Sequence, residues 1–590
     1  MGPDRDAPAP CLLVIRVTDH LSPLRHQLRW LDHAAAWGLA LVGVLVLLAT
    51  TDMGFTRDES FYFRAATDYA GWFIELEDNW RAGRLVESFT QANIDRHWGY
   101  NPEHPVLLKA LFGLSHLWLH ERWDLLSASD AMRFPAIAFT GVLLAVLYLF
   151  TLEVTGRRLA AVLAPVLLMA TPRFFFHAHL TCFDVPMTAI WVVMMYVWWK
   201  SLDRTGWAIA AGVVWGIALI TKLNAFFIPF VLLAHWAIGG WRRFSVRGGR
   251  LRVPQVPTAL FWMISLGPLI FYLGWPRHWF DTYERVRWYF NFHLKHEHYF
   301  QYYFGQNLWE PPFPVEFPFV LTLTSTPLPI LAAWFVGIGW VVSETVKRVD
   351  GRWQLVGDRF ATGTLIALNI VVPFLIIARP STPIFGGVKH WFPALPYLCL
   401  LGAYGICRTV EVLVAADRTR LRAGVAAALS VVVLAPSIAA THTYHAHGTA
   451  YWNAVVGGIS GAADRRAMRQ FWGYASRDAL DWINEHAPPN ARVAFQNTTP
   501  GAMEMYQREG WLRDDIRYGW NIERSDLVVY HHQKSFFPVQ SEIFERYETW
   551  SPSYTVTLHG VPLVSVYARS TGGTDMPSAP VPDIEPEENR

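Results

Sequence analysis

Eleven long apolar stretches constrain the fold of this chain more than any other feature of its sequence. A run of about 18 or more apolar residues with few charges is long enough to cross a bilayer as a helix. Hydrophobic residues make up 52% of the chain and charged residues only 17%, whereas a soluble domain carries about 25% charge. The sequence therefore predicts a polytopic α-helical membrane protein. The stretches lie near residues 34–50, 133–152, 158–172, 186–199, 206–221, 224–240, 257–274, 317–342, 360–378, 391–407 and 422–440.

The charge balance and the cysteines argue against two other kinds of protein. The formal net charge is +2, whereas a nucleic-acid-binding domain carries a clear basic excess, so we expect no nucleic-acid partner. The cysteines stand far apart, which gives neither a disulfide framework nor a thiolate zinc site. They are Cys11, Cys182, Cys399 and Cys407.

The basic residues between the apolar stretches indicate how the chain is oriented, because Lys and Arg collect in cytoplasmic loops. The stretch 105–119 is apolar but short, and it contains Lys109 and His116. If it lies flat on the membrane surface, every basic loop falls on the same side as the basic N-terminus. A further crossing would separate the loops from that terminus. We therefore predict eleven spanning helices, an interfacial helix over 105–119 and a cytoplasmic N-terminus over residues 1–33.

This orientation places four segments on the outer face of the membrane. They are residues 51–132, the turn 173–185, the loop 275–316 and everything after about residue 441. From Asp464 onward charged and turn residues return, and short strand-like patterns alternate with helical ones. We therefore predict a transmembrane domain over 34–440 and a small C-terminal α/β outer domain over 441–568. The tail 569–590 has the Pro, Ser and acidic bias of disordered segments.

Three carboxylates are candidates for chemistry at the outer face. Asp58 and Glu59 follow the first apolar stretch directly, and adjacent carboxylates at a membrane surface carry a desolvation cost. The alternative is a solvated pair of loop acids. Asp184 is the only acid between Glu153 and Asp203. It stands two residues before a proline, where a helix N-cap is the alternative to a functional role.

Four basic side chains are candidates for binding a lipid phosphate. Lys222 and Lys389 stand at the outer ends of apolar stretches, where a cation is costly unless it reaches water or pairs with an anion. His390 follows Lys389, and two glycines before it would let backbone N–H groups approach a phosphate. Arg133 heads the second stretch and could instead pair with an acid of the loop 51–132. Snorkelling to the interface is the alternative for the lysines.

A divalent metal ion is a further possibility at the outer face. Glu103, His104, His296 and His298 are ordinary zinc ligands. Neither stretch has the spacing of an HExxH motif, and scattered interfacial histidines are the alternative. We expect any such ion to be structural and to hold the loop 275–316, whose length and aromatic content are typical of a lid.

Short motifs recur in an order that resembles a known group of enzymes. The order covers about residues 30–440 and places each motif beside a predicted outer or inner end of a helix. The motifs are Asp58–Glu59, His104–Pro105 with Leu107 and Lys109, Arg133, Gly156 to Arg158, Asp184 with Pro186, Thr221–Lys222, Tyr302 to Gly305, Ser325 to Pro327, and KHWFPALP from Lys389. This order resembles the GT-C superfamily of membrane glycosyltransferases. It is most similar to glycosyltransferase family 39, the branch of protein O-mannosyltransferases and lipid A aminoarabinose transferases.

The resemblance implies an inverting glycosyltransferase of the bacterial inner membrane, with its active site and C-terminal domain on the periplasmic side. The donor would be a polyprenyl-phosphate-linked sugar, and the acceptor a hydroxyl of a lipid, glycan or protein. Asp58 would act as base, with Glu59 beside it, and Asp184 would orient the acceptor or the sugar. Lys222, Lys389, His390 and Arg133 would bind the donor phosphate. No cofactor would be obligatory.

The sequence departs from the family pattern, and it leaves two rival functions open. The usual HPPL motif reads HPVL, so a turn-stiffening proline is missing at Val106. The outer domain does not resemble the lumenal insert of the eukaryotic enzymes. One rival is a lipid or polysaccharide transporter, although matched halves with mid-membrane charges are not evident. The other is a non-enzymatic assembly subunit of the cell envelope, which would keep its function without Asp58.

Overall fold

The computed structural model describes residues 26–240, 245–247, 250–295, 298–349, 352–355 and 360–569. Part of the predicted cytoplasmic N-terminus, most of the predicted disordered tail, and His296 lie outside these residues, as does part of the basic stretch 241–252. The described chain is mostly helical, and its several apolar helices are those of a multi-pass membrane protein.

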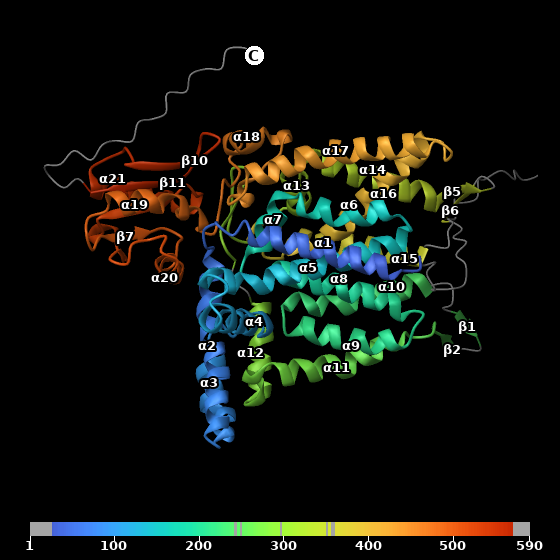
Figure 1. Cartoon of the computed structure of the whole chain (residues 1–590), viewed down its shortest axis with the longest axis horizontal. Helices are drawn as coiled ribbons and strands as arrows, with labels where there is room; N and C mark the ends of the chain where they lie inside the picture. Colours follow the sequence, from blue (N-terminus) through green and yellow to red (C-terminus); the bar gives the residue numbers. More distant parts are fainter. Residues whose placement is uncertain are drawn as a thin grey trace, which may run out of the picture.

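Long helices run side by side and form a bundle (Figure 1). Every one of the eleven apolar stretches lies on helix, and the stretch 317–342 is divided between two helices at Thr326–Pro327. The helices are α1 (Trp30–Leu48), α5 (Ala128–Thr155), α6 (Arg158–Met169), α8 (Asp184–Ser201), α9 (Gly206–Leu219), α10 (Ile228–Gly240), α11 (Thr258–Gly274), α13 (Phe317–Ser325), α14 (Leu328–Thr345), α15 (Phe360–Ala378), α16 (Leu395–Leu413) and α17 (Thr419–Thr443).

Five helices among the described residues are long and apolar enough to cross a membrane: α1, α5, α14, α15 and α17. A sixth crossing arises if α6 and α7 (Pro172–His179), bent by 75°, count as one span. The other helices of the bundle are shorter or less apolar. Eleven crossings therefore stay a prediction, although the helical character of all eleven stretches is evident.

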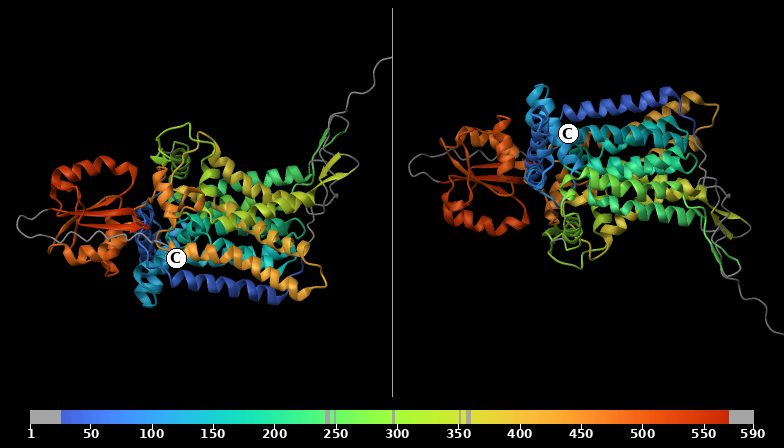
Figure 2. Two further views of the ribbon diagram at one scale, coloured as in Figure 1. Left: turned by 90° about the horizontal axis from the view of Figure 1, so that it is seen from above. Right: turned by 90° about the horizontal axis from the view of Figure 1, so that it is seen from below.

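A second set of helices lies across one end of the bundle. α2 (Arg57–Arg81), α3 (Gln91–Trp98) and α12 (Thr282–Leu294) run at a steep angle to the bundle helices (Figures 1 and 2). The stretch 105–119 forms α4 (Leu107–Ser115), followed by a π-helix over His116–Arg122. α4 packs on α2 and α5 and buries Lys109 with its apolar residues. Such an arrangement suits an interfacial segment that caps the bundle.

The C-terminal part forms a mixed five-stranded sheet beyond the same end of the bundle (Figure 1). The strand order is β10-β11-β9-β7-β8, in which β7 pairs parallel to β8 and β9 while β11 pairs antiparallel to β9 and β10. Buried valines of β9 and β11 form the centre of the sheet. The strands are β7 (Arg492–Phe495), β8 (Arg517–Tyr518), β9 (Leu527–His531), β10 (Tyr554–Leu558) and β11 (Val561–Ala568), with helices α18 (Gly458–Asp464), α19 (Leu480–His486), α20 (Pro500–Arg508) and α21 (Phe537–Tyr547).

Three hairpins complete the described elements. β3 (Gln301–Tyr303) and β4 (Gln306–Leu308) pair within the loop 275–316, at the end of the bundle that carries α2. The other two hairpins extend from the opposite end (Figure 1). They are β1 (Ser245–Arg247) with β2 (Arg250–Arg252), and β5 (Val346–Val349) with β6 (Arg352–Leu355).

Candidate active site

The Asp58–Glu59 pair stands in the first turn of α2, where the sequence Thr-Arg-Asp-Glu forms a capping box. The Thr56 hydroxyl accepts a hydrogen bond from the Glu59 N–H (3.3 Å), and the Glu59 carboxylate accepts one from the Thr56 N–H (2.8 Å). A capping box satisfies two backbone donors at a helix start. This motif fixes the direction of both carboxylates, since consecutive residues in a helix point about 100° apart.

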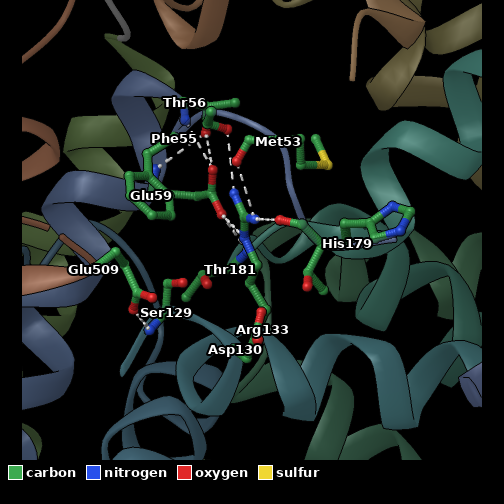
Figure 3. A network of polar contacts seen from close by, with 12 residues as sticks. Met53, Phe55, Thr56, Glu59, Ser129, Asp130, Arg133, His179, Thr181 and Glu509 are labelled. Carbon is green, nitrogen blue, oxygen red and sulfur yellow. Dashed lines mark hydrogen bonds and ion pairs between the residues drawn. The ribbon is translucent and has the colours of Figure 1, made fainter. Parts of the chain in front are cut away.

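Glu59 points into the protein and is fully buried (Figure 3). Its Oε1 accepts hydrogen bonds from the Thr181 N–H and from Arg133 Nε, both at 3.1 Å. With the two bonds from Thr56, four donors occupy this carboxylate. Its hydrogen-bonding capacity is therefore filled, which favours a positioning role for Glu59 over direct chemistry.

Arg133 is the buried partner of Glu59 and is itself fully enclosed. Its guanidinium also lies over the ring of Phe55 (4.8 Å), and three further N–H groups donate to the carbonyls of Thr51, Met53 and Gly54. The N-terminus of its helix is held in turn by Glu509, which accepts from the Ser129 N–H at 2.7 Å (Figure 3). This arrangement is the pairing with an acid that the sequence offered as the alternative for Arg133, and the guanidinium is enclosed and not open to a lipid phosphate.

Asp58 points the other way, toward the end of the bundle. Its side chain is 29% exposed, and its Oδ2 accepts a hydrogen bond from Lys389 Nζ at 3.1 Å. Lys389 also lies over the ring of Trp472 (4.2 Å). Burial by itself would lower the pKa of Lys389, but the carboxylates of Asp58 and Asp184 outweigh burial and raise it. Lys389 therefore stays charged at physiological pH.

Asp184 and Lys222 form a second pair beside the first. Lys222 Nζ donates to Asp184 Oδ1 at 2.5 Å. Asp184 is the first residue of α8 and Phe183 is its N-cap, so the N-cap alternative for Asp184 is wrong. The charges of Lys222 and Lys389 act on the Asp184 carboxylate. The structure thus brings Asp58, Asp184, Lys222 and Lys389 together from four separate elements. Each predicted cation at a helix end has an acid as its partner, which sequence spacing does not indicate.

His390 does not point a donor at this cluster. Its Nε2 lies 2.7 Å from the Phe385 carbonyl oxygen, which can only accept, so Nε2 carries the proton. Burial lowers the pKa of His390 to about 3, so the ring is neutral at physiological pH and its Nδ1 is an acceptor. An acceptor cannot bind a phosphate oxygen. The ring instead fixes the turn of Gly386–Gly387, both of which have positive φ.

The described candidates for metal ligands each have other partners. Among the described residues, no group of three or more His, Cys, Asp or Glu side chains is close enough to hold a metal ion. His104 is buried against Tyr62 and Phe183, and burial keeps its pKa well below the ordinary value. Glu103 accepts a hydrogen bond from Asn101. His298 lies against Phe313, and the fourth candidate is outside the described residues.

The loop 275–316 reaches the segment 51–132, as a lid would. His293 of α12 donates from Nε2 to the Glu103 carbonyl oxygen at 2.9 Å, and Arg285 of the same helix pairs with Asp95 at 2.5 Å. A change of order on donor binding stays a prediction.

Two further residues of this site are absent from the sequence-based candidates. Tyr62 lies one helical turn after Asp58, and burial and the Asp58 carboxylate raise its pKa well above the ordinary value. Its hydroxyl thus keeps its proton beside the cluster. Trp472 comes from the C-terminal part of the chain and covers Lys389. The i, i+4 spacing on α2 could have indicated Tyr62, whereas nothing local indicates Trp472.

The C-terminal part also holds the backbone that leads into α2. The Phe55 N–H donates to Tyr506 Oη at 3.0 Å, and the Arg57 N–H donates to the Trp472 carbonyl oxygen at 2.7 Å. The Phe55 ring stacks on Tyr506 with centroids 4.9 Å apart. The position of Asp58 therefore depends on both the bundle and the C-terminal sheet.

Comparison with protein families gives one match. Residues 118–272 match the family model described as dolichyl-phosphate-mannose-protein mannosyltransferase. The resemblance to the GT-C glycosyltransferases is confirmed. The match covers about a quarter of the chain and includes Arg133, Asp184 and Lys222. The segment with Asp58 and the segment with Lys389 lie outside it.

Three solved structures are similar to this chain at low sequence identity. ArnT from Cupriavidus metallidurans bound to undecaprenyl phosphate is 14% identical, with a TM-score of 0.47, and the similarity covers 91% of this chain and 98% of that one. Apo ArnT from the same organism is 12% identical, with a TM-score of 0.48 and coverage of 90% and 98%. The apo oligosaccharyltransferase of Archaeoglobus fulgidus is 11% identical, with a TM-score of 0.44 and coverage of 82% and 60%. A search among curated proteins gives no match.

Proposed function

We propose that this protein transfers a sugar from a polyprenyl-phosphate donor to a hydroxyl group of an acceptor, with inversion at the anomeric carbon. One observation carries the proposal. The partly exposed carboxylate of Asp58 lies against Lys389 at the end of an apolar helix bundle, beside a second pair of Asp184 and Lys222. A base and two cations at a membrane surface are what this transfer requires.

Asp58 is the base of the proposed reaction. The acceptor hydroxyl oxygen attacks C1 of the sugar, the C1–O bond to the phosphate breaks, and its electron pair stays on the phosphate oxygen. The hydroxyl proton passes to the Asp58 carboxylate. General-base assistance of this kind contributes about 10²–10⁴ in rate. The 29% exposure of Asp58 leaves the carboxylate accessible to an acceptor.

Lys222 and Lys389 bind the phosphate and stabilise the charge that grows on it as the sugar leaves. The four charged groups sum to zero in the structure, with two carboxylates against two ammonium groups. An arriving phosphate competes with Asp58 for Lys389, which would release the carboxylate to act as base. Donors fixed in place before the reaction are the main source of such stabilisation.

The neighbouring residues hold the reacting groups in place. Glu59 and Arg133 fix the start of α2, His390 fixes the turn before Lys389, and Asp184 orients Lys222 and the bound sugar or acceptor. A polyprenyl phosphate is a good leaving group once its charge is balanced, so the residues present complete the reaction without an obligatory cofactor. A metal ion that joins the lid to the loop with Glu103 would be structural.

The proposed setting is the bacterial inner membrane, with this end of the bundle on the periplasmic side. The basic loops on the opposite end support that orientation. Membrane lipids would surround the bundle, and the acceptor would be a lipid, glycan or protein of the envelope.

The deciding experiment compares Asp58→Asn with Asp52→Asn in the purified full-length protein. Both acids stand near the start of α2, but Asp52 is exposed and pairs only with His445 among the described residues. We expect transfer of label from a radiolabelled polyprenyl-phosphate sugar to envelope acceptors to fall about 10²–10⁴-fold in the Asp58 variant. The Asp52 variant should stay near the wild-type rate. Unchanged thermal unfolding with retained turnover in Asp58→Asn would refute the proposal.

A further inference from the structure

A pocket beside the Asp58 cluster has no role in the reaction described so far. Its enclosed volume is small, about 20 Å³, within about 380 Å³ of space that includes open solvent. Its walls come from α7, from the hairpin strand β3, from the 3-10 helix Gly387–Ala394 and from the chain that leads into the C-terminal sheet. The pocket therefore lies where the bundle, the loop 275–316 and the C-terminal part meet.

One wall of this pocket holds a buried cation. Arg173 is 5% exposed, and its Nε and Nη2 donate to the Tyr451 carbonyl oxygen at 3.3 and 3.1 Å. In the part of the chain that the structure describes, no carboxylate lies within ion-pair distance of Arg173. A buried charge is costly unless an opposite charge compensates it. Arg133, by contrast, is equally buried and has Glu59 as its partner.

A second buried donor belongs to Trp452, which also lines this pocket. The Trp452 indole Nε1 is buried without a hydrogen-bond partner among the described residues, although buried N–H groups are nearly always paired. The indole ring lies 4.9 Å from the Arg173 guanidinium. A buried guanidinium without a carboxylate partner and a buried indole N–H without a hydrogen bond thus belong to residues that line a single cavity, which favours an anionic ligand.

A glycine in the left-handed region forms part of the pocket wall beside Arg173. Gly387 has a φ of +63°, and a Cβ at this position would lie 3.6 Å from the Phe471 ring and 3.7 Å from Arg173 Nη1. The rest of the lining combines aromatic and aliphatic side chains, among them Tyr302, Phe304 and Leu321, with the polar Gln301 and Thr449. Binding sites for small molecules combine such apolar walls with a few placed polar groups.

The pocket adjoins the reacting groups through two short links. Gly387 stands two residues before Lys389, and Phe471 precedes Trp472, whose ring lies 4.2 Å from Lys389 Nζ. We propose that the pocket binds the phosphate or carboxylate of an anionic saccharide acceptor through Arg173 and Trp452, and so holds the acceptor hydroxyl near Asp58. This inference rests on the proposed function for its assignment to the acceptor.

Binding of defined probes to the full-length protein tests the inference without turnover. Glucose 6-phosphate and glucuronate serve as anionic probes, glucose as the neutral one, and undecaprenyl phosphate as the donor-side probe. Titration calorimetry should show binding of both anionic sugars and none of glucose. Arg173→Gln should weaken the anionic sugars about tenfold or more, since a hydrogen bond to a charged group is lost. Undecaprenyl phosphate should bind that variant normally.

Two further variants keep the test decisive. Trp452→Phe keeps the ring but removes the N–H, and it should weaken the anionic probes about fivefold even if Arg173→Gln misfolds. Arg524→Gln removes one exposed charge of the C-terminal part and should change nothing. Failure of the wild type to bind either anionic sugar would overturn the inference. So would an Arg173 variant that loses undecaprenyl phosphate and keeps the sugars. Absent transfer with intact Arg173-dependent binding would instead count against the proposed function.

Discussion

At one end of the bundle Asp58 and Asp184 pair with lysines, and at the other end Glu344 and Glu411 pair with arginines. α5 passes between the two regions with 28 residues, so about 40 Å separates them at 1.5 Å per residue. The arginine region is a closed network. Arg157 binds both oxygens of Glu411 at 2.7 and 2.8 Å, and Arg408 binds Glu411 and Glu344 together.

In the lysine region, by comparison, each ammonium group donates fewer hydrogen bonds to carboxylates among the described residues. Among the described residues, Lys389 and Lys222 each donate one hydrogen bond to a carboxylate, and each ammonium carries three donors. A guanidinium fork fits a carboxylate in one geometry, whereas an ammonium is a point charge that can change partners. We infer that the arginine pairs hold the bundle together and that the lysine pairs exchange their acids for a ligand.

The largest effect is expected for the ion pair of Arg133 with Glu59, which lies beside the lysine region. Arg133→Met should destabilise the fold by about 3–5 kcal/mol, because it leaves the fully buried Glu59 charged and unpaired. Thermal unfolding in detergent measures the loss. Adding Glu59→Gln to this variant should restore part of the stability, since the lone charge is gone. A stable Arg133→Met protein that has lost only donor binding would place Arg133 among the phosphate ligands.

The next largest effect is expected for variants in the lysine region, with a variant in the arginine region as the control. Lys389→Met and Lys222→Met should each weaken undecaprenyl phosphate binding about 10–100-fold, since a charge-assisted hydrogen bond is lost. Acceptor binding should change far less. Arg408→Met is the matched control at the other end, and it should lower the unfolding temperature while donor affinity stays the same. Unchanged donor affinity in both lysine variants would make these residues interfacial anchors only.

A smaller effect tests whether the C-terminal part positions Asp58. Tyr506→Phe removes the acceptor of the Phe55 N–H, a loss of about 1 kcal/mol, and should lower kcat about fivefold with little change in KM for the donor. Tyr518→Phe is the control, because it removes a hydrogen bond to the Thr498 carbonyl within the same sheet domain. Equal rates in the two variants would exclude a positioning role for Tyr506.

The smallest effect concerns His390 and pH. Its folded pKa of about 3 lies below the ordinary value of 6.5, so the unfolded chain binds the proton first as pH falls. Its contribution to stability is complete above about pH 6.5 and is lost as pH falls toward 3. His390→Asn should reduce this acid sensitivity, as followed by unfolding at several pH values. The pH profile of transfer between about pH 5 and 8 should not change, and loss of an acid limb there would show that His390 titrates in the reaction.

The sequence by itself determined that the apolar stretches are helical, although not all of their ends, and one predicted stretch is divided between α13 and α14. Apolar runs and helix caps are local patterns, and the chemistry behind them, burial of apolar side chains and satisfaction of the first N–H groups, is also local. The proline after Asp184 is a local signal of this kind and predicted the helix start there, whereas the Thr56–Glu59 capping box at the start of α2 was found in the structure.

The sequence could not show which of two similar neighbouring residues takes which role in the site. Asp58 and Glu59 are equivalent by composition, and only the direction of α2 makes one accessible and the other buried. Sequence also groups His390 and Arg133 with the two lysines, because all four are basic. Packing places a backbone carbonyl at Nε2 of His390 and further carbonyls around Arg133. These contacts give both side chains positioning roles in place of phosphate binding.

Only the tertiary structure decided which charges meet. Lys389 lies 331 residues from Asp58 in the chain and Lys222 lies 38 residues from Asp184, and no periodicity connects such positions. Their pairing follows from how the bundle helices pack and from where the C-terminal sheet sits, which brings Trp472 onto Lys389. Hydropathy sets which residues leave water, but the partner that a buried charge then finds depends on the shape of the whole fold.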